Sequence, residues 1–416
     1  PTVANRVPVH ASGPYKVPNY QAVGRAIHTN GPIAGAFRGF GVPQATALQE
    51  TLMDQLADQM QIDQLEFRLK NSLKDGDKTV CGQKLDSVGI VDCLKALKNS
   101  WKQKKEASIT FNTNSKRYKK GVGIATCWYG CGNTALPNPS TIKIGLTNTG
   151  RISLHRGATD IGQGSNTVIS QITADAIGVN MTNLDLVSPD TFLTPDCGKT
   201  SASRQTYVTG KAAYNAGLKL RSEILRLSNM GNDSNIKIEE ENIIISNRDK
   251  KQIINLSSLD LIENNYVIVV EETYDPPTTS LDENGQGIPY AVYGYGAQMA
   301  EITIDTELGL LKIDKITAAH DLGKTINPLL AEGQIEGGIA QGIGFALMEE
   351  YIPSKTENLH DYLIPSIGDV PEIESILIEK NDPEGPFGAR GLGEHVLIPT
   401  APAILNALRN ATGAII

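Results

Sequence analysis

Apolar positions recur at helical spacing in the first hundred residues of the chain. Residues 44–72 carry apolar side chains three and four positions apart and end before the polar run KDGDK, which predicts one or two amphipathic helices. A further helix is expected near 88–103. The basic, polar stretch that follows has the composition of a linker, and we place a domain boundary over residues 106–120.

The rest of the chain alternates between strand and helix patterns. Residues 141–157 predict two strands around an Asn-Thr-Gly turn, and residues 165–179 follow at helical period. The same order recurs as two strands in 297–321 and a glycine-rich loop leading into a helix in 328–350. We therefore expect an α+β protein built from a repeated mixed α/β unit, with the polar stretch 228–255 as a surface excursion.

Forty glycines occur in the chain, and many lie in four segments: GAFRGFG, GATDIGQG, GQIEGGIAQGIG and GARGLGEH. Dense glycine permits tight turns and close approach of the backbone to a ligand, so these loops are expected to hold a bulky molecule. Two of the loops are expected to enter helices near residues 165 and 334. The free N–H groups of such helix starts would favour a phosphate or an oxo group.

Composition excludes some classes of binding partner and favours one cellular compartment. The formal net charge of −8 argues against nucleic acid or an anionic membrane as the partner. No apolar run approaches the roughly 20 residues of a membrane span, and the first residues lack a signal-peptide pattern. Five scattered cysteines suit a reducing compartment, so a cytoplasmic location is expected. Cys127 and Cys131 have no second pair, which favours two packed thiols over a metal site.

Several common catalytic motifs are missing from the sequence. It has no Gly-x-Gly-x-x-Gly dinucleotide motif, no P-loop, no Gly-x-Ser-x-Gly elbow and no His-x3-His pair. One carboxylate, Glu394, stands among the glycines of FGARGLGEHV, beside Arg390 and His395. The residues alone indicate a ligand-binding α+β protein with one unusual glutamate, and a carboxylate on a surface turn is the alternative.

Taken together, the glycine loops resemble those of a known family. Five segments, 13–44, 157–179, 200–206, 318–350 and 388–408, are similar, in the same order, to the C-terminal part of the molybdenum-cofactor subunit of the xanthine dehydrogenase and aldehyde oxidase family of molybdenum hydroxylases. The resemblance implies that residues 1–105 are the C-terminal part of a first molybdenum-cofactor-binding domain. Residues 121–416 would be the second such domain.

The resemblance also implies cofactors and partners. Family catalytic chains begin well before the point that Pro1 matches, so the N-terminal half of the molybdenum subunit would be a separate chain. An iron–sulfur subunit with 2Fe-2S clusters and an FAD subunit would complete the assembly. The molybdenum would be held through the molybdopterin, with no direct protein ligand. The Pro1 start fits removal of an initiator methionine or a processed boundary.

Glu394 matches the family's catalytic base, which takes a proton from the water-derived nucleophile. Glycines and apolar residues hydrate a carboxylate weakly, which strengthens it as a base. In the family the next two residues are often prolines, whereas here they are His395 and Val396, so the shape of this turn is an open question. Arg390 would pair with a carboxylate or a cofactor phosphate, or face solvent.

Arg6 matches an arginine that stabilises charge developing on the heterocycle in purine-oxidising members, and a fixed cation facing such charge is a large catalytic term. This match favours hydroxylation of a xanthine- or hypoxanthine-like N-heterocycle at carbon, with water as the oxygen donor. The alternatives are a nicotinate-like acid or an aldehyde as substrate, a non-catalytic scaffold that binds the cofactor, and an inert fragment.

The remaining site residues are assigned by their match to family motifs. Cofactor contacts are expected from Arg38, Gly39, Phe40, Gly162, Gln163, Ser203 and Gln334. Substrate contacts are expected from Phe40, Tyr129, Ser201 and Ala202, with Trp128 as the other candidate aromatic. An aromatic ring offers a stacking face, and an amide both donates and accepts, as a pterin edge requires. Core packing or an ordinary structural hydrogen bond is the alternative for each.

Overall fold

The chain divides into two units in its computed structural model, which describes residues 2–31 and 35–414. The first unit comprises Pro1–Ala135, Thr279–Asp382 and Leu392–Ile416, and the second comprises Leu136–Thr278 and Pro383–Gly391. Pro1, the matched start of the chain, and residues 32–34, part of the family-like segment 13–44, lie outside the described residues.

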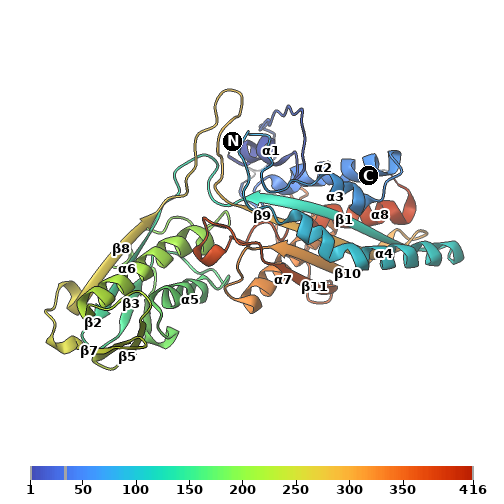
Figure 1. Cartoon of the computed structure of the whole chain (residues 1–416). Coiled ribbons are helices and arrows are strands. Elements are labelled where there is room, and N and C mark those ends of the chain that lie inside the picture. The colour runs from blue at the N-terminus through green and yellow to red at the C-terminus, as the bar shows by residue number, and fades with distance from the viewer. Residues whose placement is uncertain (1, 32–34, 415–416) are drawn as a thin grey trace. The chain divides into compact units, whose positions relative to one another are not determined.

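A four-stranded sheet forms the centre of the first unit. Its strands are β1 (Tyr118–Gly130), β9 (Tyr293–Asp305), β10 (Leu310–Asp321) and β11 (Glu372–Ile378), in the order β1-β9-β10-β11 (Figure 1). Strand β9 runs antiparallel to both β1 and β10, and β11 pairs with β10 in parallel. The register places Gly296 of β9 opposite both Cys127 of β1 and His320 of β10.

Helices cover both faces of this sheet, because side chains alternate between the faces along each strand. Ile124, Tyr293 and Met299 share one apolar core with α4 (Ile90–Asn114). Ala125, Ala300 and Ile316 share the other core with α7 (Pro328–Leu347) and α8 (Thr400–Thr412). A Cβ at Gly121 would lie 1.9 Å from the Ala407 carbonyl oxygen, so a glycine there is what lets α8 lie directly on β1.

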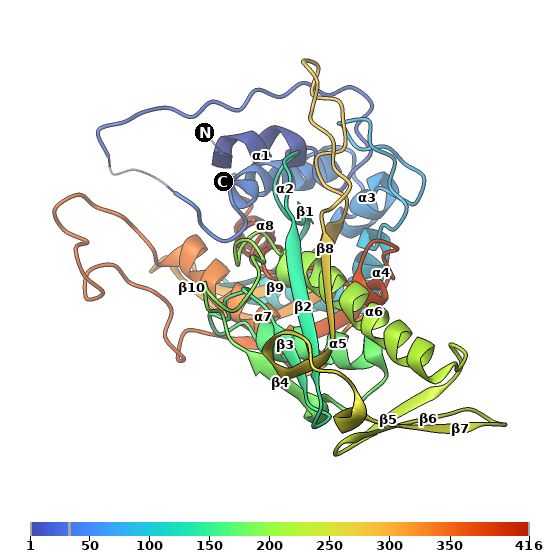
Figure 2. The same ribbon diagram turned by 90° about the vertical axis from the view of Figure 1, so that its left-hand side faces the viewer.

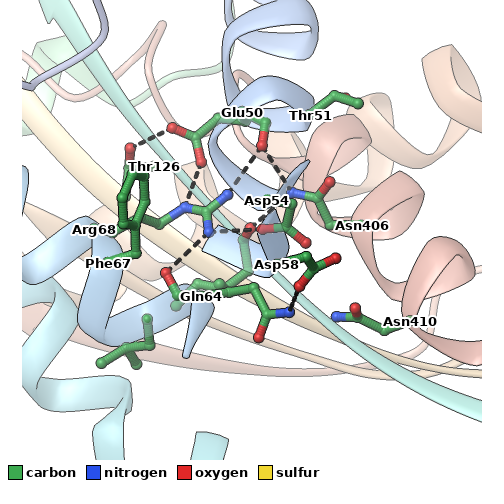
Figure 3. A network of polar contacts seen from close by, with 12 residues as sticks. Glu50, Thr51, Asp54, Asp58, Gln64, Phe67, Arg68, Thr126, Asn406 and Asn410 are labelled. Atoms are coloured by element: carbon green, nitrogen blue, oxygen red, sulfur yellow. Dashed lines mark hydrogen bonds and ion pairs between the residues drawn. The ribbon is translucent and has the colours of Figure 1, made fainter. Parts of the chain in front are cut away.

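A buried ion-pair network ties two further helices, α2 (Val42–Gln59) and α3 (Gln64–Asn71), to the sheet (Figure 3). Arg68 of α3 contacts Glu50 and Asp54 of α2 at 2.7 Å each, and all three side chains are fully buried. The Glu50 carboxylate also accepts hydrogen bonds from Tyr15 and from Thr126 of β1. Burial raises the pKa of Asp54, an effect that Arg68 opposes.

Helix α1 (Thr2–His10) is anchored to the end of β1 by the buried ring of His10. The His10 Nδ1 atom lies 2.9 Å from the Arg6 carbonyl oxygen, so it carries the proton, while Nε2 accepts from the Gly130 N–H at 3.0 Å. The indole of Trp128 donates to the His10 carbonyl at 3.1 Å. Burial, and then the neighbouring Arg6 cation, lower the pKa of His10 to about 3, so the ring is neutral.

The second unit has its own four-stranded sheet and a smaller three-stranded one (Figure 2). The larger sheet has the order β4-β3-β2-β8, with β2 antiparallel to both of its neighbours and β4 parallel to β3. Its strands are β2 (Ser140–Thr147), β3 (Ile152–His155), β4 (Leu184–Val187) and β8 (Tyr266–Tyr274). The smaller sheet consists of β5 (Asn235–Glu239), β6 (Asn242–Ser246) and β7 (Lys251–Asn255), all antiparallel.

Two long helices of this unit are α5 (Ser165–Ile177) and α6 (Gly210–Ser228). A π-helical turn, Gln205–Thr209, precedes α6. Short 3-10 turns lie at Met181–Asn183, Leu256–Ser258, Glu263–Asn265 and Pro386–Gly388. No helix in the described ranges 2–31 and 35–414 is long and apolar enough to cross a membrane.

The expected α+β class is confirmed, and so is the recurring order of two strands followed by a helix: β2-β3-α5 in one unit and β9-β10-α7 in the other. One prediction is wrong. Residues 106–114 of the expected linker are the end of α4, which continues because Trp101 and Ser108 bury its inner face. The stretch 228–255 is mostly exposed, as expected of a surface excursion, and it forms the small β5–β7 sheet around the buried Ile236, Ile243 and Ile245. The division into cofactor-binding domains at 1–105 and 121–416 stays a prediction.

The ion-pair network generates a stability prediction. Arg68→Met should lower the free energy of unfolding by about 3–5 kcal/mol, because Glu50 and Asp54 would remain buried without a counter-charge. Urea unfolding of the full chain measures this loss. Lys98→Met is the control, since the Lys98–Glu66 pair is exposed and should contribute less than about 1 kcal/mol. Equal losses in the two variants would contradict the role given to the network.

His10 generates a pH prediction. An unfolded chain takes up a proton on histidine below about pH 6.5, whereas folded His10 does so only near pH 3. The free energy of unfolding should therefore fall as the pH drops through this window, by about 1.4 kcal/mol per pH unit for this ring. His10→Gln should flatten the pH dependence of urea unfolding between about pH 6.5 and pH 4. Identical slopes for the variant and the wild-type chain would refute the prediction.

Candidate active site

The loop from Arg38 to Gly41, directly before α2, has an unusual backbone. Gly39, Phe40 and Gly41 are all left-handed, with φ of 90°, 51° and 90°. Glycine takes this conformation at little cost, but an aromatic residue there is strained. The loop thereby presents the N–H of Gly39 to Glu394, whose carboxylate Oε2 accepts it in a short hydrogen bond. The strained loop and the proposed base are thus in direct contact.

Arg38 connects this loop to two other segments of the first unit. Its Nε donates to the Gly393 carbonyl at 2.5 Å, next to Glu394. Its Nη2 donates to the carbonyl and the side-chain oxygen of Gln334 at 3.2 and 3.1 Å. Gln334 lies in the second turn of α7, because Asn327 caps that helix and Pro328 starts it. The expectation that a helix begins near residue 334 is therefore wrong.

Arg6 is held rigidly near the base. Its Nη1 donates to the Gly130 carbonyl at 3.1 Å and its Nη2 to the Gly132 carbonyl. The guanidinium carbon lies 4.5 Å from the ring centroid of Tyr129 and 5.5 Å from that of Phe40, which are cation–π distances. Burial disfavours the Arg6 cation, but Tyr129, Tyr290 and Glu394 more than compensate and raise its pKa. The side chain is therefore a fixed positive charge within electrostatic range of Glu394.

The hydroxyl of Tyr129 is a buried polar group without a hydrogen bond among the described residues. Its ring is fully buried, and burial raises the pKa of its hydroxyl well above the ordinary value. An unsatisfied buried hydroxyl costs about 1–3 kcal/mol. A bound molecule with a polar edge beside Arg6 and Tyr129 would satisfy it, which fits a cofactor or substrate at this place.

In the second unit, the loop before α5 contains Gly162 and Gln163. The Gln163 side chain folds back onto this loop, accepting from the Ile161 N–H at 2.6 Å and donating to Ser165 at 3.1 Å. The N–H groups of Gly162, Gly164 and Asn166 are taken by the Asp160 carboxylate. Burial opposes ionisation of Asp160, but these three N–H groups and Arg156 lower its pKa. The anion at the start of α5 is thus the protein's own carboxylate.

The segment with Ser201, Ala202 and Ser203 also lies in the second unit. Ala202 and Ser203 are both left-handed, with φ of 56°. A Cβ at Gly391 would lie 1.7 Å from the Ser203 carbonyl oxygen, so this close contact requires glycine at 391. Two successive strained residues are typical of functional loops, although strain alone does not identify a ligand.

Within the first unit the structure brings together seven of the predicted residues: Arg6, Arg38, Gly39, Phe40, Tyr129, Gln334 and Glu394. Gly162, Gln163, Ser201, Ala202 and Ser203 belong to the second unit. Phe40 and Tyr129 both lie against Arg6. Trp128, the other candidate aromatic, points to the opposite core and stacks on Tyr293 at 4.7 Å.

Sequence reasoning missed two neighbours of Arg6. His10 follows Arg6 by four residues on the same helix, a spacing that could have revealed it. Tyr290 lies 5.0 Å from the guanidinium, and no local pattern marks it. Cys127 and Cys131 are both buried. Among the residues that the structure describes, no three His, Cys, Asp or Glu side chains gather as a metal site.

Comparisons with known proteins agree with the family resemblance of these loops. A family model described as a molybdopterin cofactor-binding domain matches residues 95–371, and a second model of that description matches residues 1–72. The xanthine dehydrogenase molybdenum-binding subunit of Escherichia coli O157:H7 is 32% identical over 415 residues, which are 95% of this chain and 53% of the relative. The aldehyde oxidoreductase of Megalodesulfovibrio gigas is 32% identical over 96% of this chain and 42% of its own length.

Solved structures give the same result. The aldehyde oxidoreductase of Desulfovibrio desulfuricans superposes with a TM-score of 0.87 at 29% identity, over 99% of this chain and 43% of that one. The chain spans about half the length of the curated relatives it matches. With a family model covering most of its residues, the chain belongs to the molybdenum hydroxylase family, within the molybdopterin-binding subunit.

Proposed function

We propose that this chain is the catalytic half-subunit of a molybdenum hydroxylase that hydroxylates an N-heterocycle of the xanthine or hypoxanthine type at carbon, with water as the oxygen donor. The observation that carries the proposal is the position of Glu394, bonded to the strained loop at Gly39 and within electrostatic range of the fixed Arg6 cation. When bound, the molybdenum cofactor would supply the two-electron oxidation and the activation of water.

The residues of the chain would transfer the proton, stabilise charge and position the substrate. Glu394 would take the proton from the nucleophile, and Gly39 holds its carboxylate in place for that transfer. Both terminal nitrogens of Arg6 are already bonded to carbonyls, so it would act through its charge, stabilising negative charge that develops on the ring. Phe40 offers an aromatic face for a planar substrate.

We further propose that Arg38, Gly39, Phe40, Gly162, Gln163, Ser203 and Gln334 contact the pterin, and that Tyr129, Ser201 and Ala202 contact the substrate. The molybdenum would be held through the pterin without a direct protein ligand. The unsatisfied hydroxyl of Tyr129 fits such a contact, whereas the Gln163 amide would have to exchange a hydrogen bond within its own loop to reach the pterin. An iron–sulfur subunit with 2Fe-2S clusters and an FAD subunit would be partner chains in a cytoplasmic assembly.

A second substrate class rests on the names of relatives. The relatives include aldehyde oxidoreductases and the gamma subunit of the 6-hydroxypseudooxynicotine dehydrogenase complex of Paenarthrobacter nicotinovorans, which is 28% identical. An aldehyde or a nicotinate-like acid would use the same base. A non-catalytic scaffold is disfavoured, because binding alone does not require a carboxylate held at Gly39.

The role of Glu394 is tested in the purified native complex. Glu394→Gln should lower the rate of substrate oxidation by about 10²–10⁴-fold, the usual contribution of a general base, because the amide cannot accept the proton. Molybdenum and pterin content should be unchanged. Glu336→Gln, an exposed glutamate on α7, is the matched control and should keep full activity. If Glu394→Gln retained wild-type rates, the proposed mechanism would be wrong.

Arg6 separates the substrate classes. Arg6→Gln should lower kcat/KM for purines by roughly 10²–10³-fold, since a preorganised charge at the reacting centre is removed. Turnover of aldehydes should fall much less, because they develop no charge on a heterocycle. Arg6→Lys keeps the charge and should retain part of the purine activity. The measurement is steady-state kinetics with xanthine, nicotinate and an aldehyde, and unchanged purine kinetics would exclude the purine assignment.

A further inference from the structure

The turn that carries Glu394 is held by side chains from three other elements. The Gly393 carbonyl accepts from Arg38 at 2.5 Å, the His395 carbonyl from the Cys127 thiol at 3.2 Å, and the Val396 carbonyl from the Gln298 amide at 2.7 Å. Burial, and then Glu50, raise the pKa of the Cys127 thiol well above its usual range, so it keeps the proton that it donates. The backbone on both sides of Glu394 is thus fixed from outside the turn.

Gln298 is the most constrained of these donors. It is fully buried on β9, and its Oε1 accepts from the Thr400 hydroxyl at 2.7 Å. Its Nε2 donates to the Val396 carbonyl and also to Nε2 of His320 at 3.1 Å. His320 is neutral, since burial and then Arg38 lower its pKa to about 3, and its Nε2 can therefore accept. Every polar atom of the amide is used, so its orientation is fixed.

The sheet is shaped to leave room for this arrangement. A Cβ at Gly296 would lie 2.3 Å from Nδ1 of His320, and a Cβ at Gly294 would lie 2.5 Å from the His395 ring. The strand neighbours of Gln298 are both small, Ala125 on β1 and Ala318 on β10. Gly296 and Gly294, on one face of β9, therefore leave room for the rings of His320 and His395. The two alanines leave room for the Gln298 amide.

We propose that Gln298, oriented by Thr400 and His320, is a positioning residue for Glu394, holding the carboxylate against Gly39 by fixing the Val396 carbonyl of the same turn. This inference rests on the proposed function of Glu394. Gln298 bonds the backbone two residues beyond the base, so it acts through the backbone. A displacement of about 1 Å in a catalytic group can cost 10²-fold in rate, so such a support matters for turnover.

Gln298→Met in the native complex tests the proposal, because methionine has nearly the same length and no donor. Amide hydrogen exchange over residues 392–399 should rise, and kcat should fall by about 10–10²-fold with KM and molybdenum content unchanged. Asn112→Leu is the matched control, since the half-buried Asn112 amide also bonds the backbone, donating to the Lys120 carbonyl and accepting from the Lys120 N–H at 2.8 Å each, away from this turn. It should lower stability without changing exchange in 392–399 or kcat.

Each result decides the question. Unchanged exchange over residues 392–399 in Gln298→Met would overturn the proposal. Raised exchange with unchanged kcat would overturn it as well, provided that Glu394→Gln is inactive. If Glu394→Gln were active, the proposed function would fail, while the exchange data would still report on how the turn is held. Should Gln298→Met not fold, Thr400→Val removes only the hydroxyl that orients the amide, and it should give smaller changes of the same kind. No change in that folded variant would overturn the proposal.

Discussion

The buried contact of Arg68 with Glu50 and Asp54 is the constraint on which the first unit depends. The contact of Arg68 with Glu50 and Asp54 fixes α2 against α3. Because Glu50 also accepts hydrogen bonds from Tyr15 and from Thr126 of β1, it fixes α2 against β1 as well. Helix α2 begins directly after the left-handed turn at Gly39, Phe40 and Gly41. The ion pair thus determines where that turn lies. It thereby also positions the Gly39 N–H, which donates to the Glu394 carboxylate. The network thereby positions the loop that contacts Glu394, the proposed base.

A second constraint comes from the sheet. Strands β1, β9 and β10 place Cys127, Gly296 and His320 in one row and Ala125, Gln298 and Ala318 in the next. Small residues in these rows leave space for the His320 imidazole and the Gln298 amide, and Gly294 does so for the His395 ring. In the family that the sequence resembles, the two residues after the matching glutamate are often prolines, whose rings restrict the backbone. Here these residues are His395 and Val396, and the turn is restrained by hydrogen bonds from Cys127 and Gln298 of the sheet.

Much of the fold could be predicted from the sequence, because apolar spacing is a local signal. Helices α2 and α3 and the hairpins β2–β3 and β9–β10 followed from it. The start of α7 could have been found as well, since Asn327 and Pro328 form a cap and a first helical residue. The contacts of Arg38 and Gln298 could not be predicted, because their partners lie far along the chain and include backbone carbonyls, which have no signature in a sequence. Likewise, Asp160 and Gly164 predict a loop, but not that Asp160 would occupy the helix start.

The contact between Arg38 and Gly393 joins residues 355 positions apart. During synthesis, Gly39 therefore emerges 355 residues before Glu394, the carboxylate that accepts its N–H. The aromatic pocket around Arg6 also waits for Tyr290. The contacts around Arg38, Gly39 and Arg6 therefore cannot form until these distant segments have been made. A ligand that contacts both segments could bind only after both have been made.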